Sequence, residues 1–200
     1  MKIISIGCNC DTGFFIKHNF GAAYYPFDWI WSTIDFVIKT FETDYFEFTE
    51  CEKLNAIWVP PNEHTYIFNN NCNGNADRIC SAVSVHDADH QSKEQYTASI
   101  PHINEKYKRR FARLYDALNS GEDIILIRKV LDKTQGAVKK DYDTNEKLNY
   151  LSALVSKKFK SKIKICVFDN EGFIRSDALN ENIKLFHSFN DMFSYIKTLN

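Results

Sequence analysis

An uninterrupted run of four large apolar residues, Ile124-Ile125-Leu126-Ile127, is the feature that most constrains the fold of this chain. A strand with one solvent-facing side alternates apolar and polar residues, so an unbroken run predicts a central strand covered on both faces. Ile163 to Phe168 repeats this pattern, and segments with helical periodicity lie between and after the two runs. The sequence therefore predicts an α/β fold with a mostly parallel sheet flanked by helices.

The first strand is expected at Lys2 to Ile6, a β-branched run that ends at Gly7. Polar side chains suited to helix capping follow it, so we expect a tight turn that carries cysteines and then a helix. The other expected elements are a helix opened by a capping box at Ser32 and Asp35, a strand over 79–85, a helix that starts after Pro101, a helix through Leu148 to Phe159, a strand over 183–186 and a helix through Met192 to Leu199.

The size of the chain suits one domain over residues 1–200, since single domains of about this length are common. The formal net charge of −1 argues against a dedicated nucleic-acid-binding protein. The charge is unevenly distributed, because residues 104–162 hold 15 Lys and Arg but 8 Asp and Glu. We expect this region to favour anions.

Apolar stretches are only a few residues long, far short of the roughly 20 that cross a bilayer. The start of the chain also lacks the pattern of an export signal, so we expect a cytoplasmic protein without a membrane partner. In that compartment its 6 cysteines are expected to be thiols and not a disulfide framework.

Two of the cysteines, Cys8 and Cys10, fall in the predicted turn between the first strand and the first helix. Backbone amides and the helix dipole at such a position favour a negative charge. A cysteine there is a candidate nucleophile, and the same amides, with Asn9 beside them, suit the stabilisation of an oxyanion. The alternative is that either cysteine is a small buried apolar residue.

A thiol nucleophile needs a proton acceptor, and histidine is the side chain best suited to that role near neutral pH. His86 is the leading candidate, because it follows the predicted strand at 79–85 and precedes Asp87. His187, after the predicted strand at 183–186, is the second candidate. The string from His86 to His90 also allows a metal-site reading, but the cysteines form no C-x-x-C pairs, and no metal is expected.

Further candidates for the site come from an aromatic segment and two arginines. Asp28 and Trp29 follow a proline in an aromatic stretch, where Trp29 suits a substrate groove and Asp28 either orients a histidine or caps backbone amides. Arg110 lies at the edge of an apolar helical stripe and Arg128 ends an apolar strand, so both are candidates to bind a substrate anion. No phosphate-binding loop motif is present, and no cofactor is expected.

Several of these residues occur in an order that resembles a known family. The matching stretches are residues 5–10, 26–29, 83–87, 107–113 and 124–128. Through them the chain resembles papain-like cysteine peptidases of bacteria and large DNA viruses. The resemblance implies cysteine-dependent hydrolysis in which Cys10 is the nucleophile and His86 acts as base and then as acid. Asp87 or Asp28 would orient the histidine.

We therefore expect a cysteine hydrolase that cleaves an amide, isopeptide or ester bond of a protein, peptide or acylated substrate. One alternative is an esterase-like or transferase-like α/β enzyme for acylated or carbohydrate substrates, in which His187 replaces His86. The other is a non-catalytic binding module for a protein segment or an anionic ligand. That module predicts that Cys10→Ala preserves binding while Arg110→Ala or Arg128→Ala weakens it.

Overall fold

The structure is a computed structural model that describes residues 1–7, 10–21, 24–44, 68–69, 82–84, 93–130 and 143–199. Within these ranges, four strands form a parallel sheet in the order β1-β5-β6-β7. Their bounds are β1 Lys2–Ser5, β5 Asp123–Lys129, β6 Lys162–Phe168 and β7 Ile183–Phe186. The predicted α/β fold with a mostly parallel sheet is confirmed, and a helix that starts at Cys10 follows the first strand.

The sheet is central because β5 and the second half of β6, residues 165–168, are buried on both faces. Residues 124–127 of β5 are all buried, as the unbroken apolar run predicts. β5 pairs with β1 on one side and with β6 on the other, in registers such as Ile3↔Ile125 and Leu126↔Ile165. β1 and β7 are therefore the two edge strands of this sheet.

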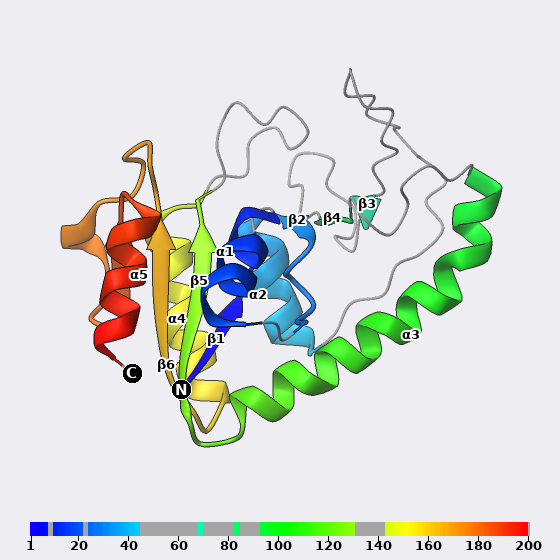
Figure 1. The fold of residues 1–200 in the computed structure, drawn as a ribbon, viewed down its shortest axis with the longest axis horizontal. Coiled ribbons are helices and arrows are strands. Elements are labelled where there is room, and N and C mark those ends of the chain that lie inside the picture. The colour runs from blue at the N-terminus through cyan, green and yellow to red at the C-terminus, as the bar shows by residue number, and fades with distance from the viewer. Residues whose placement is uncertain are drawn as a thin grey trace.

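Helices cover both faces of the sheet (Figure 1). α1 (Cys10–Phe20) and α5 (Phe189–Thr198) lie on one face, where Ile16, Met192 and Ile196 pack with Ile127. α2 (Ile34–Thr43), α4 (Asn145–Lys158) and the carboxyl half of α3 (Lys93–Leu118) contribute to the core on the other face. A short 3₁₀ helix, η1 (Ser176–Ala178), lies between β6 and β7.

A second, antiparallel sheet has the strand order β2-β4-β3 and was not expected from the sequence. Its strands are β2 (Ile30–Ser32), β3 (Phe68–Asn69) and β4 (Ala82–Ser84). β4 is part of the strand predicted over 79–85, but it pairs in this smaller sheet and not with the parallel strands. Residues 79–81 and 85 lie outside the described residues.

Two helix starts differ from the sequence expectation. The N-cap of α2 is Thr33, whose Oγ1 accepts the Phe36 N–H at 3.2 Å, and not Ser32, which ends β2. α3 begins at Lys93 and continues through Pro101, although the sequence suggested a start after that proline. A proline removes one backbone donor from a helix, and the helix retains its other bonds.

Of the helices that the structure describes, none has both the length and the hydropathy needed to cross a membrane.

Candidate functional site

All four parallel strands end at the same edge of the sheet, and Cys10 lies at this edge because it begins the helix after β1 (Figure 1). Ligands of open parallel sheets bind beyond the carboxyl ends of the strands, where the connecting loops lie. The Cys10 side chain is half-buried. Four other predicted site residues, Cys8, Asn9, His86 and Asp87, lie outside the described residues.

The turn between β1 and α1 requires a glycine where it begins. Gly7 has a φ of 84°, a backbone conformation that other residues rarely adopt. A Cβ at Gly7 would also lie 2.0 Å from Ser32 Oγ, so the turn passes too close to β2 for a side chain. The Gly7 N–H donates to Ser5 Oγ at 3.2 Å, and the Ser5 and Thr12 hydroxyls hydrogen-bond at 2.8 Å. The turn is thereby fixed to the strand before it and to the helix after it.

The segment Asp28–Ser32 packs against the chain on both sides of Cys10. Ser32 contacts the turn at Gly7, as described above. Farther along, a Cβ on Gly13 of α1 would lie 2.3 Å from the Asp28 carbonyl oxygen. β2 belongs to this segment and pairs with β4, so the smaller sheet is held beside the Cys10 turn.

Asp28 is a buried acid in this segment, with 5% of its surface exposed. Its Oδ2 accepts the Tyr25 N–H at 2.7 Å, which is the backbone-capping contact considered from the sequence. Burial raises the pKa of the Asp28 carboxyl to about 7, although the Tyr25 hydrogen bond and the charges of Arg110 and Arg113 act in the opposite direction. The carboxyl therefore changes its protonation state near neutral pH.

Arg110 faces inward from α3, as its position at the edge of the apolar stripe predicts. Its guanidinium carbon lies 5.1 Å from the centre of the Tyr107 ring and 6.0 Å from that of Tyr24. Its Nη1 is buried and donates no hydrogen bond to an acceptor within the described ranges. Arg109 and Arg113, on the opposite side of the stripe, are exposed.

Arg128, at the carboxyl end of β5, is fully buried. Its Nε and Nη2 donate to the two carboxylate oxygens of Asp143, at 2.8 and 2.9 Å. Its Nη1 donates to the Ile6 carbonyl oxygen at 3.2 Å and to Ser32 Oγ at 3.3 Å. The guanidinium predicted to bind a substrate anion is thus engaged by acceptors of the protein itself.

An aromatic pair, one ring exposed and the other half-buried, lies one helical turn from Cys10. Phe14 is four residues after Cys10, so both side chains lie on the same face of α1. Phe14 is 56% exposed and packs edge-on against Trp29, with ring centres 4.9 Å apart. Sequence reasoning selected Trp29 but missed Phe14, although its four-residue spacing from the cysteine is visible in the sequence.

The second candidate base, His187, also lies at the carboxyl edge of the sheet but at its other end. It follows β7, whereas Cys10 follows β1, and β5 and β6 lie between these two strands. The His187 Nδ1 hydrogen-bonds to the Asp169 carbonyl oxygen at 2.6 Å. At roughly 4.8 Å per strand spacing, the ends of β1 and β7 are about 14 Å apart.

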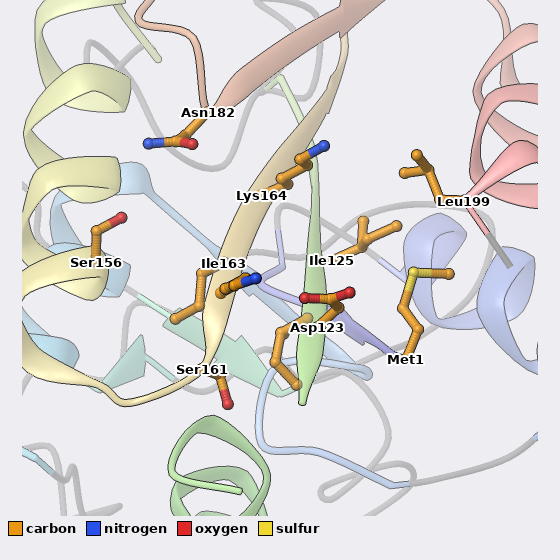
Figure 2. A pocket seen from close by; sticks show the side chains of 11 residues that line it. Met1, Asp123, Ile125, Ser156, Ser161, Ile163, Lys164, Asn182 and Leu199 are labelled. Atoms are coloured by element: carbon orange, nitrogen blue, oxygen red, sulfur yellow. The ribbon is translucent and has the colours of Figure 1, made fainter. Parts of the chain in front are cut away.

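A hollow of about 540 Å³ lies at the opposite end of the sheet, at the amino ends of the strands (Figure 2). Asp123 and Lys162 begin β5 and β6 there, and Met1 and Leu199 line the same space. The hollow is therefore separated from Cys10 by the length of the sheet, and it offers no space for chemistry at that thiol.

The chain was compared with protein families, curated proteins and solved structures. Residues 1–171 match a family described as putative papain-like cysteine peptidase. No curated protein and no solved structure matches the chain. The matched range includes Cys10 and the whole segment up to β6, and it ends before β7.

Proposed function

The chain belongs to the family described as putative papain-like cysteine peptidase, and from this premise we propose that it is a cysteine-dependent hydrolase with Cys10 as its nucleophile. One observation carries the proposal. The segment Asp28–Ser32 packs on both sides of Cys10, and it pairs with the strand that leads to His86. The proposal is that this arrangement brings together the thiol of Cys10 and the imidazole of His86, two residues from distant parts of the sequence.

The register of the smaller sheet supports His86 as the base. Ser84 of β4 pairs with Ile30 of β2, and the two strands run in opposite directions. This is the last pair of the register, and on the β2 side the turn over 26–29, with Asp28, directly precedes Ile30. Two residues of chain span at most about 7 Å, and Asp28 itself contacts α1. The proposal therefore has Asp28 or the adjacent Asp87 orient His86 toward Cys10.

The proposed reaction begins when His86 takes the proton of the Cys10 thiol, and the resulting thiolate forms a bond to a substrate carbonyl carbon. The positive end of the α1 dipole stabilises both the thiolate and the oxyanion that develops on the carbonyl oxygen. The intermediate then expels an amine or alcohol, which takes a proton from His86. Water, deprotonated by His86, cleaves the remaining thioester and releases Cys10.

His86 is preferred to His187 for two reasons. The family match covers residues 1–171, which include His86 and exclude His187. The strand order also separates His187 from β1 by three strand spacings. An esterase-like or transferase-like enzyme that uses His187 would need a different arrangement of the carboxyl edge.

The surroundings of Cys10 suggest the class of substrate. The exposed ring of Phe14, packed against the half-buried Trp29, offers an apolar wall one turn from the thiol, which suits an apolar side chain or acyl group. Arg110, with a buried Nη1 that the described residues leave without an acceptor, is the better candidate for an anionic group. Cys8 and Asn9 remain proposed contacts of the substrate carbonyl. We propose a protein, peptide or acylated substrate with these features.

Thiol labelling with iodoacetamide, mapped by peptide mass spectrometry, tests the paired mechanism. Cys166 is an internal control, because it is fully buried and burial raises its pKa to about 12. At pH 7 we expect Cys10 to react faster than the other cysteines, His86→Ala to slow it, and His187→Ala to leave it unchanged.

Two other outcomes point elsewhere. If His187→Ala slows the labelling and His86→Ala does not, the esterase-like alternative is favoured. If Cys10 reacts no faster than the remaining cysteines and neither histidine matters, the protein is a binding module, and Cys10→Ala should then preserve ligand binding.

A further inference from the structure

The buried ion pair of Arg128 and Asp143 contacts the chain at the start of the turn that carries Cys10. Both side chains have 0% exposure, and they form two parallel hydrogen bonds at 2.8 and 2.9 Å. Such a pair loses the hydration of two charges, so it contributes less to stability than its short distances suggest. Apolar side chains of similar volume often fill such a space equally well. The pair therefore calls for an explanation other than stability.

The remaining donor of Arg128 reaches the chain at the entry to the turn. Nη1 donates to the carbonyl oxygen of Ile6, which precedes Gly7, and to Ser32 Oγ. A Cβ on Gly7 would lie 3.5 Å from that same Nη1. One guanidinium thus links three parts of the chain: the end of β1, the end of β2, and Asp143, which lies two residues before the start of α4.

The shape of arginine explains why this residue type occupies the position. The planar guanidinium presents two donors to the carboxylate and directs a third to another side. A lysine at position 128 would offer a single nitrogen and would be unable to hold Asp143 and Ile6 in the same fixed geometry.

We propose that Arg128 and Asp143 are positioning residues that fix the Cys10-bearing turn, an inference that rests on the proposed function of Cys10. Asp143 orients the guanidinium, and the guanidinium holds Ile6 and Ser32. The Ser5 and Thr12 hydroxyl pair holds the other end of the turn. The thiol is thereby kept at the start of α1, where the helix dipole acts on it.

The test uses two readouts on the full chain: hydrogen–deuterium exchange of the peptide spanning residues 1–16, and the iodoacetamide labelling rate of Cys10 at pH 7. The variants are Arg128→Lys, which retains the charge, and Asp143→Asn, which retains one acceptor. Asp169→Asn is the matched control, because Asp169 is also a buried acid at the carboxyl edge and accepts three backbone N–H groups of its own loop.

In both test variants we expect faster exchange in the 1–16 peptide and a roughly tenfold slower labelling of Cys10, toward the rate of an ordinary thiol. The control variant, Asp169→Asn, is expected to lower the melting temperature without changing exchange in the 1–16 peptide or the labelling rate of Cys10. Ser32→Ala, which removes one Arg128 acceptor and leaves the ion pair in place, is the milder variant if the others fail to fold. It should show the same exchange effect at smaller size.

The outcomes separate this inference from the proposed function. If exchange and labelling in the test variants change no more than in Asp169→Asn, the pair is merely structural and the inference is overturned. If Cys10 of the unaltered protein is no more reactive than other thiols, but exchange in the 1–16 peptide rises selectively, the pair still fixes the turn and it is the nucleophilic role of Cys10 that fails.

Discussion

Asp28→Asn should make the protein more stable at alkaline pH and change the pH dependence of its stability. The carboxyl has a pKa near 7 because it is buried, whereas in the unfolded chain it has its ordinary value of 3.8. Between pH 3.8 and about pH 7, the folded protein therefore holds a proton on Asp28 that the unfolded chain has lost. The contribution of Asp28 to the free energy of unfolding is fully present below about pH 4 and is lost as the pH rises through about 7.

The size of the effect follows from the two pKa values. The rise in the pKa of Asp28 from 3.8 to about 7 corresponds to a loss of roughly 4 kcal/mol in the free energy of unfolding. This loss is measured from low pH, where the carboxyl is protonated in both states, to high pH, where it is charged in both. Between pH 5 and pH 8 the same two values give a loss of about 2.5 kcal/mol. Asparagine is close in shape to the protonated acid and still accepts the Tyr25 N–H, but it takes on no charge.

Urea unfolding of both proteins at pH 5 and pH 8 measures this difference. The stability of Asp28→Asn relative to the unaltered protein should increase by about 2.5 kcal/mol between the two pH values, or about 5–10 °C in melting temperature for a chain of this size. Asp169→Asn serves as the control, because losing a carboxylate that accepts three backbone N–H groups should be destabilising at both pH values. An Asp28→Asn difference that is equal at pH 5 and pH 8 would refute the reasoning.

Three further predictions follow from the packing around Cys10. Gly13→Ala should destabilise the protein by about 1–3 kcal/mol in urea unfolding, because its Cβ would collide with the Asp28 backbone; a smaller loss would show that α1 shifts freely. Phe14→Ala should leave stability within about 1 kcal/mol, since the ring is 56% exposed, but should slow labelling by a phenylalanyl chloromethyl ketone more than labelling by iodoacetamide. Equal effects on the two reagents would remove Phe14 from the proposed substrate wall. Cys166 should remain unlabelled at pH 7 until the protein unfolds, and early labelling would contradict its burial.

The parallel sheet was predictable because burial on both faces leaves a direct trace in the sequence. The unbroken apolar run of β5 and the largely apolar run of β6 located these two strands, and the strand expected at 183–186 has the same bounds as β7. The smaller sheet left no comparable trace. β4 falls within the strand expected at 79–85, but the strands of this sheet, as described, are two or three residues long, and β2 pairs with β4 across 50 to 54 residues of sequence, so no local pattern indicated this pairing.

The candidate site shows the same division between local and distant information. The turn after β1 and the inward direction of Arg110 follow from patterns a few residues long, and both were predicted. The partner of Arg128 was not, because Asp143 is 15 residues away and nothing in the spacing links an arginine at a strand end to one particular acid. The contacts of Gly7 with Ser32 and of Gly13 with Asp28 were equally hidden, since a glycine in a sequence does not show what it touches.

The central claim is that the fold activates Cys10, and the most direct measurement compares its iodoacetamide labelling rate in the native protein with the rate in concentrated urea at pH 7. Unfolding exposes the half-buried thiol but removes the helix start, the Arg128 contacts and any nearby imidazole. Our account predicts that native Cys10 reacts faster than unfolded Cys10, despite its smaller exposure. A native rate equal to or below the unfolded rate would contradict it.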